Sequence, residues 1–365
     1  DYMHPWIYQK SCLNINSEFN TGDFVFVSYK NKINAAGFLD KNSLYALKIF
    51  EFNVEPEKFD VKACLKNKIL KAVSYRNSIG YNKVCRIVHG EADGIPGLFI
   101  ERYENLIVIQ YSFKGIYNFS NLITEIIIEL FDDISIFIIS PDNEKKIIYG
   151  NIKLPVKIEI DNVKFYINPD GQKTGFYLDQ RINRINLSNY VRKGMRILDS
   201  FAYTGGFALY CMRRGAVADI IEYNKRYVDQ FEQNCELNGF MQSQYKCYIG
   251  RTEEIFKRLD SKYDIIFIDP PGLVSKSNQK NNALKYIYNL FIDAISLLNS
   301  EGIISLSVCS NILTDDSLNR TIMNACAAKK ERFRIIYENR SSSDHPVLLN
   351  FPEGDYLRCL AFQKV

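Results

Sequence analysis

From about residue 168 onward the sequence alternates between two kinds of segment, and this alternation restricts the chain to few folds. Short apolar runs have the length of strands, and the segments between them have the length and spacing of helices. Strands that alternate with helices favour a parallel, doubly wound α/β sheet, in which ligands bind beyond the carboxyl ends of the strands. The predicted strands are residues 196–199, 219–222, 263–269 and 302–309, and the predicted helices are 206–214, 225–238, 283–298 and 317–329.

Residues suited to a bound nucleoside lie at three of these strand ends. Asp199 is followed by a loop that ends in Gly205-Gly206, where missing side chains let the backbone approach a ligand. Glu222 ends the next strand, about 20 residues further on, where an acid can bind ribose hydroxyls. Asp269 opens an Asp-Pro-Pro sequence at the third strand end. Together the three resemble a class I S-adenosylmethionine methyltransferase, which has a Rossmann-like fold.

Each of these features also has a plain structural interpretation. The glycine pair could be only a tight turn, Glu222 could stabilise a helix N-terminus, and the two prolines could end a strand. The loop after Asp199 lacks the Gly-x-Gly-x-x-Gly fingerprint of dinucleotide-binding proteins. A nicotinamide dehydrogenase is therefore the least favoured enzyme class.

The first half of the chain follows a different pattern. Residues 1–57 predict a small all-β module, with strands at 24–29 and 44–52 and turns at Gly37 and at 40–43. Residues 58–165 predict an α+β domain, and residues 166–365 make up the α/β domain. Within residues 58–167 the predicted helices are 61–74 and 122–131, and the predicted strands are 84–88, 98–102, 106–111, 134–140 and 163–167.

The cysteines and histidines argue against a metal site. Nine cysteines include no Cys-x-x-Cys pair, and the three histidines lie far apart, so we expect reduced thiols in the cytoplasm, with neither zinc nor disulfides. We also expect no signal peptide and no membrane span, because no apolar run reaches about 18 residues. A net charge of +4 is compatible with a nucleic-acid partner.

Longer motifs resemble one bacterial family, the 23S rRNA cytosine-5 methyltransferases with an N-terminal PUA domain. The run from Asn168 to Arg181, which reads NPDGQKTGFYLDQR, resembles the lead-in to the family's catalytic domain. His4-Pro5-Trp6-Ile7 resembles the opening of its PUA domain, and residues 86–98 resemble its central-domain signature. Residues 344–347 and 351–357 resemble its C-terminal signature. The resemblance therefore spans nearly the whole chain, and it implies a PUA-like RNA-binding module over residues 1–57.

The resemblance also implies which residues bind S-adenosylmethionine. One departure affects the adenine contact, because the family has Gly-Asp where this chain has Gly250-Arg251, and Thr252 or Glu253 could substitute. The implied cofactor contacts are Lys173, Phe176, Tyr177, Asp179, Arg181, Asp199, Phe201, Tyr203, Thr204, Gly205, Glu222, Thr252 and Asp269.

Cys309 and Asp269 are the candidate catalytic residues. Ser307-Val308-Cys309-Ser310 resembles the family's Ser-Cys-Ser motif, with Val308 in place of the first serine. A thiolate that adds to carbon 6 of a pyrimidine makes carbon 5 nucleophilic enough to accept a methyl group. Asp269 would hold the target base or the cofactor, and it could also relay a proton. Without the resemblance, Cys309 would be interpreted as a buried strand cysteine, the usual place of that residue.

The resemblance implies ribosomal RNA as partner, either 23S rRNA or an assembly intermediate, and leaves a homodimer open. Lys276 and Lys280 could contact phosphates or lie on a solvated loop. His345 and Glu353 could be structural or could transfer protons. Two alternative functions stay open: a methyltransferase acting on another base or RNA, which would not need Cys309, and a non-catalytic RNA-binding factor in ribosome assembly.

Overall fold

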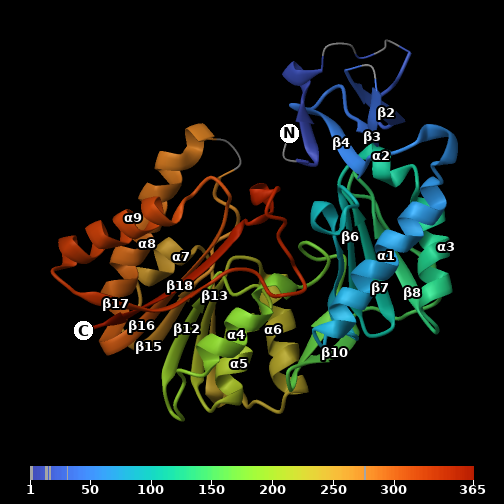
Figure 1. Ribbon diagram of the computed structural model, residues 1–365. Helices are drawn as coiled ribbons and strands as arrows, with labels where there is room; N and C mark the ends of the chain where they lie inside the picture. The colour runs from blue at the N-terminus through green and yellow to red at the C-terminus, as the bar shows by residue number, and fades with distance from the viewer. Residues whose placement is uncertain (1–2, 13–14, 16–17, 31, 275–276) are drawn as a thin grey trace. The chain divides into compact units, whose positions relative to one another are not determined.

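The computed structural model describes residues 3–12, 15, 18–30, 32–274 and 277–365, and it divides into two compact units (Figure 1). Unit 1 consists of Asp1–Ile158, Ile167–Leu178 and Ser343–Gly354, and unit 2 of Glu159–Tyr166, Asp179–Ser342 and Asp355–Val365. The chain first passes from unit 1 to unit 2 within β10 (Val156–Ile160), which forms a two-stranded sheet with β11 (Val163–Ile167). Unit 1 therefore takes a segment from the C-terminal part of the sequence.

An antiparallel sheet opens unit 1. Its strands are β1 (Trp6–Tyr8), β2 (Phe24–Tyr29), β3 (Lys32–Leu39) and β4 (Tyr45–Phe52), in the order β1-β4-β3-β2. The predicted turn at Gly37 is wrong, because this residue lies inside β3, where the register with β4 shifts between Ala36 and Gly37. A Cβ at Gly37 would overlap the backbone of Lys48, so the glycine serves close strand approach at a bulge.

The second sheet of unit 1 has five strands, in the order β5-β6-β7-β8-β9. Helix α3 connects β7 to its parallel neighbour β8, and the other neighbouring strands pair antiparallel. Apolar residues of α1 and α3, among them Ile69 and Ile127, pack in one core with the strands and with Phe38 of the first sheet. The elements are α1 (Val61–Ser78), β5 (Val84–His89), β6 (Leu98–Tyr103), β7 (Leu106–Tyr111), α2 (Lys114–Tyr117), α3 (Ser120–Leu130), β8 (Ser135–Ile139) and β9 (Lys145–Tyr149).

Unit 2 is built on a seven-stranded sheet in the order β14-β13-β12-β15-β16-β18-β17. The five strands from β14 to β16 are parallel, as predicted, but β18 runs antiparallel to both β16 and β17. The prediction of a purely parallel sheet is thus wrong at this edge, because no crossover helix joins β17 to β18. The strands are β12 (Arg196–Ser200), β13 (Val217–Glu222), β14 (Tyr245–Ile249), β15 (Tyr263–Ile268), β16 (Leu298–Cys309), β17 (Phe333–Asn339) and β18 (Leu357–Lys364).

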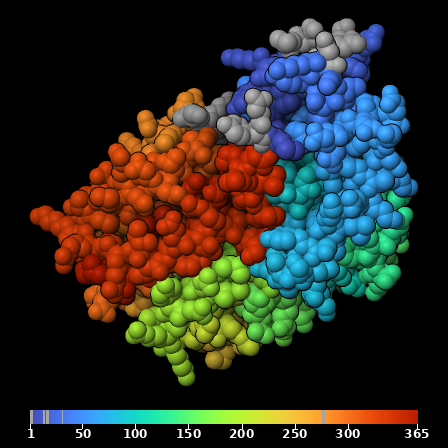
Figure 2. Space-filling view, viewed as in Figure 1, coloured from blue at the N-terminus to red at the C-terminus, as the bar shows by residue number. Residues whose placement is uncertain are grey.

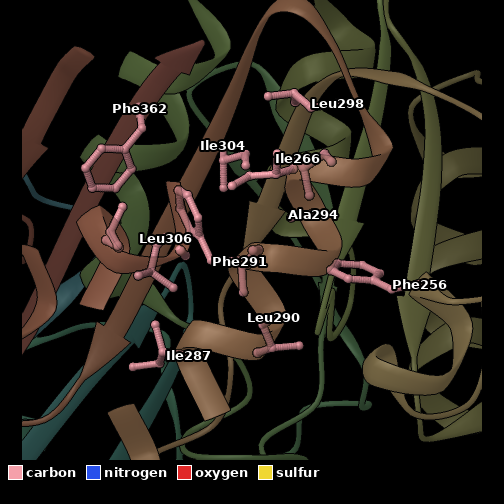
Figure 3. Packing of buried hydrophobic residues seen from close by; sticks show 14 of the residues in the cluster. Phe256, Ile266, Ile287, Leu290, Phe291, Ala294, Leu298, Ile304, Leu306 and Phe362 are labelled. Carbon is pink, nitrogen blue, oxygen red and sulfur yellow. The ribbon is translucent and has the colours of Figure 1, made fainter. Parts of the chain in front are cut away.

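Helices cover this sheet, and α8 carries much of the core on its face. Ile287, Leu290, Phe291 and Ala294 of α8 point toward apolar residues of β15, β16 and β18 (Figure 3). The predicted helices are all present, but α4, α7, β14, β17 and β18 were not anticipated. The helices are α4 (Arg181–Ser188), α5 (Gly206–Arg213), α6 (Lys225–Leu237), α7 (Thr252–Phe256), α8 (Lys280–Leu297) and α9 (Asp315–Lys329).

Short 3-10 turns complete the secondary structure. Residues of unit 2 from about 300 to 342, coloured orange to red, form much of its visible surface (Figure 2). No helix in the described ranges is long and apolar enough to span a membrane. The 3-10 turns are Gln9–Ser11, Pro56–Lys58, Gly90–Asp93, Leu178–Gln180, Gln242–Gln244, Ser277–Gln279 and Pro352–Gly354.

Candidate active site at the strand ends of unit 2

The parallel strands of unit 2 bring the predicted strand-end residues to one edge of the sheet. Strand β12 pairs with β13 on one side and β15 on the other, and β15 pairs with β16. Glu222 ends β13, Asp269 directly follows β15, and Cys309 ends β16. Because parallel strands share their carboxyl edge, these side chains and the loop after β12 lie at the same edge of the sheet.

The loop after β12 has an unusual backbone. Phe201 and Tyr203 have positive φ angles of 60° and 51°, which non-glycine residues adopt at a cost of about 1–3 kcal/mol each. Three hydrogen bonds hold the loop: Ala202 N–H donates to the Ile221 carbonyl at 3.1 Å, Tyr203 N–H to Glu222 Oε2 at 2.9 Å, and Gly205 N–H to the Ala202 carbonyl at 2.8 Å. The loop is therefore fixed by the neighbouring strand, and its conformation is set within the protein.

Gly205 and Gly206 are required by packing within the protein. Gly205 has a φ of 82°, and a Cβ there would overlap the ring of Phe231. A Cβ at Gly206 would lie 2.6 Å from Nε of Arg184. The glycine pair thus lets a core aromatic ring and a buried arginine approach the start of α5, which accounts for both residues without any ligand.

Glu222 is tied to the backbone on both sides. Its Oε2 accepts from Tyr203 N–H and its Oε1 accepts from Asn224 N–H, each at 2.9 Å. Burial raises the pKa of this carboxyl, and the backbone donors lower it in part. Each carboxylate oxygen has two lone pairs, so each oxygen of Glu222 can accept a second hydrogen bond, for example from a ribose hydroxyl.

Asp199 is 1% exposed, and its Oδ2 accepts the N–H of Ala208 in the first turn of α5 at 2.9 Å. Burial raises the pKa of Asp199 to about 8, with the negative charge of Asp269 adding to the rise and Arg184 opposing it. In the structure Asp199 therefore stabilises the N-terminus of α5 beneath the loop. Thr204, also buried, accepts a hydrogen bond on its carbonyl from Asn234 Nδ2 at 3.2 Å.

Asp269 is held by Ser200 and Gln180, neither of which is among the predicted site residues. Its backbone N–H lies 3.5 Å from the Ser200 carbonyl, and its Oδ2 accepts from Gln180 Nε2 at 3.2 Å. Arg184 is 5% exposed; burial lowers the pKa of its guanidinium, and the nearby carboxylates of Asp179, Asp199 and Asp269 oppose that effect. Gln180 and Arg184 both lie in the segment that follows Asp179. The helical spacing of this segment is the one feature of the sequence that could have indicated that the two residues lie on a helix near the site.

The predicted lead-in residues divide between the two units. In unit 1, the Lys173 ammonium lies 4.2 Å from the ring centre of Tyr177, whose hydroxyl donates to Gln172 Oε1 at 2.7 Å, and Phe176 is 2% exposed. In unit 2, Asp179 Oδ2 accepts from the Tyr356 hydroxyl at 2.8 Å, and Arg181 forms a two-pronged pair with Asp161. Within unit 2, Asp179 is thus hydrogen-bonded to the residue just before β18. Arg181 is paired with an acid in the turn between β10 and β11.

Cys309 lies half-buried at the carboxyl end of β16, opposite Leu357 of β18. A Cβ on Gly272 would lie 3.8 Å from the Cys309 carbonyl, so the Asp-Pro-Pro loop runs beside this strand end. The next residue, Ser310, is anchored by its N–H to the Tyr356 carbonyl at 2.7 Å. Cys309 therefore stands next to the loop that carries Asp269.

Other cysteines of unit 2 are poor candidates for a reactive thiol. Cys211, Cys235 and Cys359 are fully buried. Burial raises the pKa of all three, that of Cys359 to about 12, and also raises the pKa of Cys247 to about 12. A thiol that stays protonated at neutral pH is a weak nucleophile. None of these four cysteines lies at the carboxyl end of a parallel strand, whereas Cys309 ends the parallel strand β16.

The residues near the predicted adenine contact lie at the start of α7. Thr252 is its first residue and is 2% exposed, and Gly250 N–H donates to the Glu222 carbonyl at 3.1 Å. The Arg251 side chain is exposed, 3.6 Å from Glu253 Oε1. Thr252 is thus buried, two residues after Gly250, which is hydrogen-bonded to Glu222. The Arg251 side chain, in contrast, is exposed to solvent.

The remaining candidates lie elsewhere. Lys276 is outside the described residues, and Lys280 begins α8. His345 and Glu353 belong to unit 1, where His345 Nδ1 lies 2.9 Å from Asp344 Oδ1 and Glu353 pairs with His4 at 3.1 Å. Both therefore take part in contacts within unit 1.

Known proteins resemble this chain along most of its length. The profile of a family described as Conserved hypothetical protein 95 matches residues 183–307. The chain is 30% identical over 366 residues to MJ1649 of Methanocaldococcus jannaschii, provisionally named a ribosomal RNA large subunit methyltransferase, with 98% of this chain and 93% of that protein covered. It is 28% identical over 385 residues to ribosomal RNA large subunit methyltransferase I of Shewanella frigidimarina, covering 98% and 94%.

Solved structures share the fold at lower identity. A protein provisionally assigned as an S-adenosylmethionine-dependent methyltransferase, from Streptococcus mutans, has a TM-score of 0.83 at 19% identity, covering 98% of this chain and 95% of that one. A protein provisionally assigned as a methyltransferase, SMU.776, solved with S-adenosylhomocysteine, has a TM-score of 0.85 at 19% identity, covering 99% of this chain and 96% of that one. The fold is thus that of class I methyltransferases. The relatives that align over nearly the full length show that the chain belongs to the ribosomal RNA large subunit methyltransferase family.

Proposed function

We propose that this enzyme transfers a methyl group from S-adenosylmethionine to carbon 5 of a cytosine in large-subunit ribosomal RNA, with Cys309 as nucleophile. The observation that carries the proposal is the placement of Cys309 at the end of β16, beside the loop that follows Asp269. A methyltransferase that acts on an exocyclic amine needs no thiol there. A half-buried thiol at this edge supports covalent chemistry on the base.

The residues at the strand ends fit S-adenosylmethionine by their chemistry. Glu222 has acceptor capacity for ribose hydroxyls, and the loop from Phe201 to Gly205 presents a fixed backbone next to it. When bound, S-adenosylmethionine supplies an electrophilic methyl group on a sulfonium cation, for which acidic and aromatic neighbours are favourable. We propose that Asp199 supports this site from beneath and that Asp179, Arg181 and Thr252 contribute to it. The cofactor contacts predicted for Lys173, Phe176 and Tyr177, which belong to unit 1, stay predictions.

The protein's own groups would carry out the remaining steps. The Cys309 thiolate adds to carbon 6, forming a carbon–sulfur bond and raising electron density at carbon 5. Carbon 5 would then take the methyl group as the bond from that group to the sulfonium sulfur breaks, which would leave S-adenosylhomocysteine as the neutral product. A base removes the carbon-5 proton, the electron pair restores the 5,6 double bond, and the Cys309 sulfur leaves. Asp269 would hold the target cytosine in position through these steps.

The target base has to leave its stack to reach the strand ends. We propose that the first sheet of unit 1 is a PUA-like module that binds structured RNA, so that ribosomal RNA or an assembly intermediate is the partner. The relatives named as ribosomal RNA methyltransferases support this choice of RNA. We propose the cytoplasm as the place where this enzyme meets its RNA, because the bacterial relative is named for ribosomal RNA.

The test of this function has two parts. Incubation with labelled S-adenosylmethionine and unmodified large-subunit RNA, followed by nucleoside analysis, is expected to give 5-methylcytosine. Another methylated nucleoside would overturn the base assignment.

The second part traps the covalent adduct. A 5-fluorocytosine in the RNA has no carbon-5 proton to lose, so in the presence of S-adenosylmethionine this RNA should stay attached to the wild-type enzyme on a denaturing gel. Cys309→Ala should form no adduct, whereas Cys326→Ala, the same change at a half-buried thiol on α9, should behave as wild type. An adduct with Cys309→Ala would contradict the assignment of the nucleophile.

A further inference from the structure

We propose that Gln180 is a positioning residue for Asp269 and that a relay of side-chain amides starting at β17 fixes its orientation. The inference rests on the proposed function, since Asp269 is the acid assigned to the target base. Gln180 lies directly before α4, is 2% exposed, and donates from Nε2 to Asp269 Oδ2 at 3.2 Å. A glutamine can present either an oxygen or a nitrogen, so what matters is what holds this amide in place.

The relay begins with Asn183, whose orientation is set by two donors. Its Oδ1 accepts from the Tyr337 hydroxyl at 2.8 Å and from Asn339 Nδ2 at 2.9 Å. The Tyr337 oxygen in turn accepts from Asn186 Nδ2 at 3.2 Å, which leaves the Tyr337 proton directed at Asn183. Asn183 is fully buried, so a flipped amide would place its nitrogen against two donors without access to water.

Asn183 then dictates the orientation of Gln180. Its Nδ2 donates to Gln180 Oε1 at 2.7 Å and to the Arg340 carbonyl at 3.2 Å, so both of its protons are used. Because the oxygen of Gln180 faces Asn183, the nitrogen of Gln180 must face Asp269. The spacing of Gln180 and Asn183, three residues apart at the start of α4, brings the two amides to neighbouring positions.

The relay delivers one N–H donor to a carboxylate at the strand-end edge. A donor to a carboxylate favours its ionised form and restricts the plane of the group. Asp269 is followed immediately by Pro270 and Pro271, so the backbone on its far side has little freedom either. Polar groups of β17, the edge strand of the sheet, thus determine how an acid three strands away presents its oxygens.

The decisive variant is Gln180→Glu, which keeps the size and replaces the donor by an ionisable oxygen. At pH 8 a carboxylate would face Asp269, and we expect kcat for RNA methylation to fall about 10- to 100-fold. At pH 5.5 the introduced carboxyl group can be protonated and donate to Asp269 again, so the ratio of variant to wild-type kcat should rise as the pH falls. A ratio that does not change with pH would overturn the proposal, because a merely structural defect would not recover.

A stability measurement tests the same contact independently of activity. In Gln180→Glu the pKa of the introduced carboxyl group should be raised in the folded state by burial and by Asp269, so the variant should lose stability relative to wild type as the pH rises from 5.5 to 8. Gln242→Glu, at an exposed position in the 3-10 turn before β14, is the control and should show no such trend. Equal pH dependence of Gln180→Glu and Gln242→Glu in urea unfolding would refute the relay.

Asn183→Asp tests the relay one step back. An aspartate oxygen facing Gln180 would attract Nε2 and turn Oε1 toward Asp269, so kcat should fall although Gln180 itself is unchanged. Wild-type kcat in a folded Asn183→Asp protein would contradict the relay. If the wild-type enzyme methylates no ribosomal RNA, the proposed function fails, and the unfolding measurements still decide whether Gln180 faces Asp269.

Discussion

The N–H of Tyr203 donates to Glu222 Oε2 at 2.9 Å, and through this bond one carboxylate fixes the loop after β12 to the end of β13. Glu222→Gln keeps the size of the side chain but can turn an NH2 group toward the Tyr203 or Asn224 N–H. We expect the affinity for S-adenosylmethionine to fall about tenfold or more, measured by calorimetry, since a donor facing a donor forfeits a charge-assisted bond. Glu236→Gln, at a position on α6 away from the strand ends, should leave the affinity unchanged.

Gly205→Ala should destabilise the protein more than Gly239→Ala does. Both glycines have positive φ, 82° and 75°, so the backbone cost of about 1 kcal/mol is common to the two changes. At Gly239 a Cβ meets nothing within 4 Å, whereas at Gly205 it would overlap Phe231 and add an overpacking cost of about 1–3 kcal/mol. Urea unfolding of the two variants measures the difference, and equal losses would show that the loop yields to the extra carbon.

Asp199 should make stability depend on pH. The pKa of this carboxyl is about 8 in the folded protein, against 3.8 for the ordinary side chain, so the folded state binds the extra proton between these values. Its contribution to stability is therefore complete below about pH 4 and is lost as the pH rises to about 8.

Asp199→Asn removes this titration and still accepts from Ala208. The free energy of unfolding of the variant relative to wild type should rise from pH 5 to pH 8 and then level off, as followed by urea unfolding at a series of pH values. Asp260→Asn, the same change at an exposed position in the loop before β15, is the control. A flat difference for Asp199→Asn would mean that Asp199 is ionised in the fold throughout this range.

The buried charges of unit 1 offer a matched pair of ion-pair tests. The fully buried Glu101 accepts from Nε and Nη2 of Arg86 at 2.8 and 2.5 Å and also accepts from the hydroxyls of Tyr103 and Thr174. Glu101→Ala would remove the carboxylate that is hydrogen-bonded to the Arg86 guanidinium and leave a buried charge without this partner, so we expect a loss of about 3–5 kcal/mol in the free energy of unfolding. Glu129→Ala, which removes the exposed partner of Lys66, should have little effect. A small loss for Glu101→Ala would mean that Asp344, whose Oδ2 accepts from the Arg86 N–H, or water compensates the Arg86 charge.

The sequence predicted the elements whose pattern is local. Strand β7 and strand β11 have the bounds expected from their apolar runs, and α6 differs by one residue. Strand β18 was missed, although Leu357, Leu360 and Phe362 are buried, because it follows a long segment without helical or strand periodicity. Its antiparallel direction depends on a partner strand far back in the chain, which no local pattern reports.

In the candidate site, too, the residues whose place follows from local sequence could be predicted, and the contacts between distant residues could not. Strand-end residues such as Glu222 and Cys309 could be located because the position of a strand end follows from local sequence. The contact of Gln180 with Asp269 joins residues 89 positions apart, and Asn183 meets Tyr337 across 154 positions. The roles of Gly205 and Gly206 were likewise hidden, since Phe231 and Arg184 are close to them only after folding.

The path of the chain after Ser342 has a consequence for biosynthesis. The segment Ser343–Gly354 belongs to unit 1, and only afterwards does β18 enter the sheet of unit 2 between β16 and β17. While a ribosome has translated no further than residue 342, β16 and β17 lack the strand that joins them. An apolar edge is then exposed on the nascent chain, and a chaperone that binds extended apolar segments would find its target during this interval.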